Sequence, residues 1–177
     1  LTDLPVYIQI HGENTERIVE RAQELHRISP GQIGFKVISD EKGFLAIRRL
    51  ADAGIRCIAT TLFSVSQAAV AASAGAAGIC PFVSRAAAIG MDPGRIIGTI
   101  RRGYDRLLKA PEIIAVSMKS VADVELALAS GADAVGMRYP LLREMMTHPL
   151  SAKAELLFGQ NWARVKGEDV SYLAGAA

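Results

Sequence analysis

Lys36 is the side chain of this sequence that most suggests chemistry, because it interrupts an apolar run. In "IGFKVISDEKG", residues 33–43, it stands between Phe35 and Val37 in a pattern that predicts a buried strand. Burial disfavours the ammonium form, and a neutral amine can attack a carbonyl to form a Schiff base. The alternative is a lysine near a strand end whose ammonium reaches solvent. The pattern alone favours this alternative.

Polar side chains also end or follow other apolar runs, and each has two interpretations. The Gln9 amide and the Thr60 hydroxyl could hydrogen-bond a substrate or a water. Otherwise they are a satisfied strand-end group and an ordinary β-branched strand residue. Arg85 and Lys119 could clamp a phosphate, with Ser117 as a further donor. Otherwise the two charged residues lie solvated in loops.

Short apolar runs alternate with helix-like segments along the chain. Residues 13–28 carry apolar side chains at helical spacing, with Asn14 as a candidate N-cap. A helix end, a glycine and the next apolar run recur at Gly54, Gly75 and Gly131. Nearly continuous apolar runs are typical of parallel strands buried on both faces, so the pattern predicts an α/β fold. The expected strands span residues 6–10, 33–38, 57–63, 78–83, 112–118 and 133–139.

Two architectures fit this alternation, a (β/α)8 TIM barrel and a doubly wound open sheet. Neither GxGxxG nor GxxxxGK follows an expected strand, which disfavours the open sheet. We therefore expect one barrel domain over residues 1–177, with six of the eight βα units and a C-terminal helix. The first two units would precede Leu1. Barrel strands end at one rim, where Arg138 in the sixth run and His11 would join the polar residues above.

Composition and charge argue against several classes of function. A net charge of +2 gives no reason to expect nucleic acid or a membrane as partner. Residues 57–84 carry no charge, but their many small and hydroxyl side chains predict strand, helix and strand rather than a spanning helix. Cys57 and Cys80 lie in apolar runs, which suggests free thiols in a reducing cytoplasm. The histidines and cysteines show no metal-binding spacing, so we expect no metal site.

Five blocks of the chain resemble the short transaldolases and fructose-6-phosphate aldolases, which are Schiff-base aldolases on a (β/α)8 barrel. "GFKVISDEKGFLAIRRLADAGI" resembles the family block "VKIP-T--GL-AI--L---GI", which implies Lys36 as the Schiff-base lysine. "ATTLFSVSQAAVAASAGA" implies Thr60 as the active-site threonine, and "PFVSR" implies Arg85 as a phosphate ligand. "AVSMKS" implies phosphate contacts at Ser117 and Lys119, and "THPLSAKAELLFGQNW" resembles the family's C-terminal segment.

Departures from the family pattern bear on the kind of reaction. The family's "DTAN"-like and "TTNPS"-like motifs do not occur in these residues, and the first supplies an aspartate for proton transfer. Gln9 and Ile58 resemble the aldolases, whereas Phe82, at the position of a tyrosine that helps hold the catalytic water, resembles the transaldolases. Asp40 and Glu41 are unusual after the lysine, and they would oppose its neutral form if they faced it.

The resemblance implies cleavage or transfer of a dihydroxyacetone unit on a sugar phosphate, with Lys36, Thr60, Gln9 and Phe82 as catalytic residues. It implies that this chemistry needs neither a metal nor an organic cofactor. It also implies a place in carbohydrate metabolism such as the pentose phosphate route, and a homo-oligomer with the C-terminal helix at the contact. The alternative is a catalytically silent relative that binds sugar phosphates. Another phosphate-handling barrel, such as an isomerase, lacks supporting motifs.

Overall fold

The computed structural model describes residues 4–167 of the chain, and strands and helices alternate through them. The predicted domain of residues 1–177 therefore includes two short ends, 1–3 and 168–177, that lie outside the described part. The strands are β1 (Val6–Gln9), β2 (Ile33–Ile38), β3 (Cys57–Leu62), β4 (Gly78–Pro81), β5 (Glu112–Ala115) and β6 (Ala134–Val135). The helices are α1 (Thr15–His26), α2 (Glu41–Asp52), α3 (Val65–Ser73), α4 (Val83–Ala88), α5 (Pro93–Tyr104), α6 (Val121–Ala129), α7 (Tyr139–Met145) and α8 (Pro149–Lys166).

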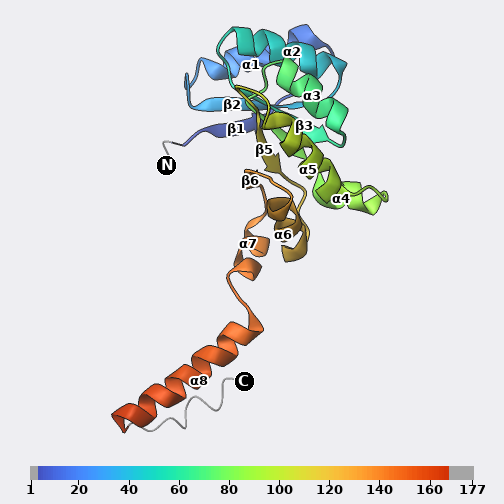
Figure 1. Cartoon of the computed structure of the whole chain (residues 1–177). Helices are drawn as coiled ribbons and strands as arrows, with labels where there is room; N and C mark the ends of the chain where they lie inside the picture. The colour runs from blue at the N-terminus through green and yellow to red at the C-terminus, as the bar shows by residue number, and fades with distance from the viewer. Residues whose placement is uncertain (1–3, 168–177) are drawn as a thin grey trace. The chain divides into compact units, whose positions relative to one another are not determined.

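The six strands form one parallel sheet in the order of the sequence, β1-β2-β3-β4-β5-β6. The helices α1, α2 and α3 lie together on one side of β1, β2 and β3 (Figure 1). A doubly wound sheet would reverse its strand order and carry helices on both faces. The observed order is that of consecutive βα units of a barrel, so the predicted α/β fold is confirmed as a partial TIM barrel.

The hydrophobic core lies between the sheet and its helices. Phe35, Ala59, Ile79 and Ile113 are each 0% exposed, and they come from four successive strands. On the helical side the buried residues are Ile47, Leu50, Ala68, Ala71, Ile97, Val124 and Ala127. The charge-free segment 57–84 forms β3, α3, β4 and the start of α4, as its small residues predicted. No helix in the described part of the chain is long and apolar enough to cross a membrane.

The opposite face of the sheet is shaped by close contacts between neighbouring strands. A Cβ added at Gly34 would lie 2.6 Å from a ring carbon of Tyr7, and one added at Gly78 would lie 3.3 Å from Cδ1 of Ile114. The two glycines therefore leave room for larger side chains of the adjacent strands. This face carries no helix of the residues 4–137, and it is the one that a barrel turns inward.

The last two strands are shorter than the sequence predicted. β5 ends at Ala115 rather than Met118, because the backbone of Ser117 enters the left-handed region with φ of 65°. β6 contains only Ala134 and Val135. The prediction that Arg138 lies in this strand is wrong, because Arg138 is the N-cap of α7, whose first turn contains Pro140.

The chain divides into two compact units, residues 1–137 and 138–177. The described part of the second unit holds α7 and α8. His148 caps α8 by accepting a hydrogen bond from the amide of Leu150, and Gly167 ends it with φ of 73°. Phe158 and Trp162 of α8 are 69% and 64% exposed. The role of this helix in an oligomer stays a prediction.

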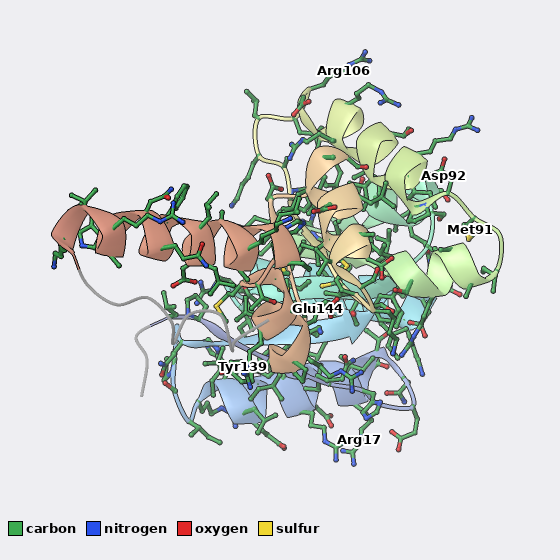
Figure 2. The ribbon with its side chains drawn as sticks, turned by 90° about the horizontal axis from the view of Figure 1, so that it is seen from below. Arg17, Met91, Asp92, Arg106, Tyr139 and Glu144 are labelled. Atoms are coloured by element: carbon green, nitrogen blue, oxygen red, sulfur yellow. The ribbon has the colours of Figure 1, made fainter. Side chains whose placement is uncertain are left out.

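Polar surface side chains mark the outside of the helical layer. Figure 2 shows Arg17 on the outer side of α1, Met91 and Asp92 at the turn between α4 and α5, and Arg106 beyond the end of α5. Arg17 forms an ion pair with Glu20 at 2.9 Å, with both side chains more than half exposed. Such a pair contributes little to stability because water screens it.

The first turn of α2 tolerates only glycine at position 43. A Cβ there would lie 2.0 Å from the carbonyl oxygen of Ile38. Gly43→Ala is therefore expected to lower the free energy of unfolding by about 1–3 kcal/mol, the usual cost of overpacking. Gly103→Ala in α5 is the matched control, since nothing lies within 4 Å of its added Cβ. It should raise the free energy of unfolding by about 0.5–1 kcal/mol in urea titrations. Equal stability of the two variants would contradict this account of the turn.

Candidate active site

Lys36, Thr60 and Cys80 lie on one face of the sheet, on three successive strands. Lys36 pairs with Ile58, and Ile38 pairs with Thr60, so position 60 of β3 has the same parity as position 36 of β2. Gly78 pairs with Ile58, which gives Cys80 of β4 this parity as well. Alternate residues of a strand point to opposite faces. Since the other set lies beneath the helices, these three side chains point to the inner face of the partial barrel.

Cys80 is the group that links the other two. Both the Thr60 side chain and the Lys36 charge are close enough to act on its thiol. Burial raises the pKa of the Cys80 thiol to about 11, although the Lys36 charge and the Thr60 hydrogen bond both act to lower it. Lys36 is half-buried, whereas Thr60 and Cys80 are 1% and 2% exposed. Lys36 therefore lies partly exposed beside two enclosed polar side chains, those of Thr60 and Cys80.

Sequence reasoning treated Cys80 only as a buried thiol and missed its place beside Lys36. A signal was present in the spacing. Cys80 precedes Phe82, a predicted site residue, by two positions, and residues two apart in a strand share a face. The predicted free state of Cys57 and Cys80 agrees with the structure, in which both are unpaired and buried.

A bulge at the end of β3 holds Thr60 in place. The register between β3 and β4 shifts between Ala59 and Leu62, and Thr61 inside the shift has φ of 59°. A β-branched residue rarely adopts this left-handed conformation. The Thr61 hydroxyl donates to the carbonyl of Thr60 at 2.5 Å. Bulges redirect side chains beside active sites, and strained backbone collects there.

Gln9 supports the backbone of the lysine strand. Its side-chain nitrogen donates to the carbonyl oxygen of Lys36 at 3.1 Å, and the amide of Ile10 donates to the same oxygen at 3.0 Å. The Gln9 side chain is otherwise exposed at the outer edge of β1. The structure thus places Gln9 beside Lys36, and its role toward a water or substrate stays a prediction.

The two acids after Lys36 belong to the start of α2. Asp40 is the N-cap, and its carboxylate accepts a hydrogen bond from the amide of Gly43 at 2.8 Å. Glu41 is exposed in the first helical turn, where a negative charge is favourable. Ser39 donates its hydroxyl to the carbonyl of Thr60 at 2.8 Å. The unusual "SDEK" segment therefore caps a helix and ties β2 to β3.

The predicted phosphate ligands come from α4, which follows β4 directly, and from the loop after β5. The Arg85 guanidinium lies 4.8 Å from the centre of the Phe82 ring, and Phe82 meets the Phe63 ring edge-on with centroids 5.6 Å apart. The backbone of Phe82 pairs with Val116, which extends the contact between β4 and β5 beyond the strands. Arg85 is exposed, so its charge is available to a ligand.

Ser117 and Lys119 lie just beyond this contact. The amide of Ser84, next to Arg85, donates to the carbonyl of Ser117 at 3.2 Å. Lys119 is exposed, and Ser117 is half-buried. The structure thus brings the start of α4, which contains Arg85, close to the loop that contains Ser117 and Lys119. A phosphate requires such a set of cationic and hydroxyl donors.

Two other hollows of the first unit do not contain these residues. A cavity of about 430 Å³ lies beyond the ends of β1 and β2, and it is lined in part by His11, Arg21 and Lys42. An apolar groove of about 390 Å³ lies between α3 and α5 on the helical side. Among residues 4–167, no group of three or more histidine, cysteine or acidic side chains could hold a metal ion.

Solved structures share the fold of this chain. Mandelate oxidase with (S)-2-phenylpropionate superposes with a TM-score of 0.57 over 75% of this chain, at 16% identity. Mandelate oxidase with benzoyl-formic acid gives a TM-score of 0.56 over 74% of the chain, also at 16% identity. The chain spans about half the length of these structures, 48% in both cases. At this identity the likeness concerns the fold alone.

Sequence relatives identify the family within that fold. A family profile described as Transaldolase/Fructose-6-phosphate aldolase matches residues 1–171. A probable transaldolase of Pelotomaculum thermopropionicum is 31% identical over 166 residues, which cover 94% of this chain and 77% of the relative. A probable transaldolase of Thermoplasma acidophilum is 30% identical over 165 residues, which cover 93% and 74%. The chain belongs to the transaldolase/fructose-6-phosphate aldolase family, as the resemblance predicted.

Both cysteines are expected to resist alkylation in the folded protein. Burial raises the pKa of Cys80 to about 11 and that of Cys57 to about 12, so the reactive thiolate is scarce at pH 8. Intact-protein mass spectrometry after iodoacetamide treatment should show no modification of the native state and two modifications in urea. Rapid labelling of native Cys80 would contradict its enclosure beside Thr60.

Proposed function

We propose that this protein cleaves or transfers a dihydroxyacetone unit of a sugar phosphate through a Schiff base on Lys36. The observation that carries the proposal is the position of Lys36, on the inner face of a family-typical sheet and next to the enclosed Thr60–Cys80 pair. In a barrel, reactive groups at the carboxyl ends of strands face the substrate. A lysine on the helical face could not do so.

The amine of Lys36 acts in its neutral form. It attacks the keto carbon of the substrate, and the carbinolamine loses water to give an iminium. A base, acting through a water held by Thr60 and Gln9, takes the proton of the hydroxyl on the carbon beyond the bond to be broken. That carbon–carbon bond breaks, its electron pair moves to the iminium nitrogen, and an aldehyde leaves. An enamine of the dihydroxyacetone unit remains on Lys36.

The fate of the enamine separates the two reactions. Protonation at carbon followed by hydrolysis of the iminium releases dihydroxyacetone, which is aldolase chemistry. Attack of the enamine carbon on a second aldose phosphate is transaldolase chemistry. Gln9 and Ile58 favour the first reaction, whereas Phe82 and the relatives named probable transaldolase favour the second. Lys36, Thr60 and Gln9 serve both.

Lys42 offers a comparison that explains why Lys36 is preferred. Its ammonium donates to the carbonyl oxygens of Gly12 and Glu13, at 3.0 and 3.5 Å. These hydrogen bonds hold the Lys42 nitrogen against the backbone that follows β1. Lys36, in contrast, is half-buried beside a neutral thiol.

The distal phosphate of the substrate is held by Arg85, Ser117 and Lys119. Arg85 in α4 follows β4, and the loop of Ser117 and Lys119 follows the neighbouring strand β5. One phosphate can therefore contact residues from both segments. Anchoring the phosphate fixes the sugar chain and thereby the bond that must lie next to Lys36. We further propose a cytoplasmic homo-oligomer, which rests on the family and on the exposed apolar side chains of α8.

A second candidate function is sugar-phosphate binding without turnover. The family's "DTAN"-like motif, to which the resemblance assigns the aspartate for proton transfer, does not occur in the 177 residues. This candidate keeps the phosphate ligands but predicts no covalent adduct on Lys36. The two functions are therefore separated by one trapping experiment.

Borohydride reduction in the presence of dihydroxyacetone or fructose 6-phosphate should leave a stable adduct on Lys36. Peptide mass spectrometry locates it. Lys36→Met should abolish the adduct, because the amine is removed, whereas Lys42→Gln should retain it. An adduct on another lysine would overturn the assignment. Absence of any adduct, with phosphate binding intact, would favour the silent binding protein.

Arg85→Gln should selectively weaken the binding of phosphorylated substrates. A hydrogen bond to a charged group contributes about 1.5–3 kcal/mol, so KM for fructose 6-phosphate should rise roughly tenfold or more. The trapping rate with unphosphorylated dihydroxyacetone should change little. Arg106→Gln is the charge-matched control, since Arg106 is exposed beyond α5 (Figure 2). Equal effects of both variants would mean that Arg85 acts only through net charge.

A further inference from the structure

We propose that Asp123 is a positioning residue of the phosphate site, because its carboxylate joins the start of α4, which follows β4, to the loop after β5. This inference rests on the proposed function for the identity of the ligand. Asp123 does not itself contact the phosphate in this account. It acts through the neighbours of Arg85, Ser117 and Lys119.

One carboxylate oxygen of Asp123 receives three hydrogen bonds. The Ser84 hydroxyl donates to Oδ2 at 2.6 Å, the amide of Lys119 at 2.8 Å and the amide of Ser120 at 3.1 Å. The amide of Asp123 in turn donates to the Ser120 hydroxyl at 3.2 Å. The last two contacts form a capping box at the start of α6. A capping box does not require the Ser84 contact, which crosses to α4 and is separated by 39 positions in the chain.

Each proposed phosphate ligand adjoins this set of contacts, which we call the Asp123 bridge. Arg85 follows Ser84 directly, and Lys119 donates its own amide to the carboxylate. Ser117 is connected to the bridge through Ser84, because the Ser117 carbonyl accepts a hydrogen bond from the amide of Ser84 at 3.2 Å. Ser117 also holds a left-handed backbone with φ of 65°, a conformation that a non-glycine residue keeps only when its surroundings impose it.

The bridge also decides which groups can meet a phosphate. The amides of Lys119 and Ser120 at the start of α6 donate to Asp123, so these two amides are not available to the anion. Burial would raise the pKa of Asp123, but hydrogen bonds from Ser84, Lys119 and Ser120 outweigh it and lower the pKa. The carboxylate is thus ionised at neutral pH, and its charge alone would repel a phosphate.

Because Asp123 is charged, the direction in which Asp123→Asn changes the affinity for phosphate tests the proposal. If Asp123 acted mainly as a nearby negative charge, Asp123→Asn would tighten phosphate binding. If it positions the loops, the same variant loosens them and weakens binding in spite of the lost repulsion. Ser84→Ala removes only the link between the loops and leaves the capping box of α6 in place, so it should weaken binding with little loss of stability.

Calorimetric titration of the purified protein with inorganic phosphate and with glycerol 3-phosphate measures the effect. We expect Kd to rise at least fivefold in Asp123→Asn and in Ser84→Ala, with no further rise in the double variant. The matched control is Asp92→Asn. Asp92 caps α5 by accepting from the amide of Arg95 at 2.9 Å, and it lies at the turn before that helix (Figure 2). Asp92→Asn should lower the stability of the protein about as much as Asp123→Asn does, and it should leave Kd unchanged.

Unchanged or tighter phosphate binding by both Asp123→Asn and Ser84→Ala would overturn the proposal. So would an equal loss of affinity in Asp92→Asn, or wild-type protein that binds neither probe. Trapping with unphosphorylated dihydroxyacetone keeps this outcome separate from the proposed function. If the wild type forms no adduct on Lys36 but its phosphate affinity depends on Asp123, the Schiff-base function fails and the bridge stands.

Discussion

The structure depends on the two-sided character of its parallel strands. One set of alternate residues must be apolar because helices cover it. Phe35, Ala59, Ile79 and Ile113 belong to this set, and all four are fully buried. Polar side chains can stand only in the other set. Lys36, Thr60 and Cys80 all do so, and the register between strands brings them together. The apolar neighbours of Lys36 therefore position it without enclosing it.

The ends of the strands carry the conformational cost of this arrangement. Thr61 and Ser117 are the non-glycine residues with positive φ in the described part of the chain; Thr61 is the second-last residue of β3, and Ser117 follows β5. Hydrogen bonds surround both places: Thr61 bonds to Thr60, and the Asp123 bridge fixes the loop of Ser117. In both the catalytic and the phosphate-binding half of the site, hydrogen bonds thus restrain a strained backbone near the end of a strand.

Much of the fold was predictable because it follows from local patterns. The six strands, the Asn14 cap and the glycine turns are present, and Gly54, Gly75 and Gly131 all have positive φ. The sixth strand was overestimated, since an apolar pattern does not reveal that Arg138 begins a helix. The role of Asp40 as an N-cap was missed although it is a local pattern, and the role of Asp123 was missed because it depends on a hydrogen bond from Ser84, 39 positions away. The family blocks placed candidate residues, but only the register shows which of them share a face.

The central claim is that the amine of Lys36 faces the substrate on the inner face of the sheet, beside Thr60 and Cys80. A crystal structure of the protein reduced in the presence of dihydroxyacetone tests it most directly. The account predicts continuous density from Nζ of Lys36 to a three-carbon unit, with the Thr60 hydroxyl next to it. Density for an unmodified Lys36, or for an adduct on the helical side of the sheet, would contradict it.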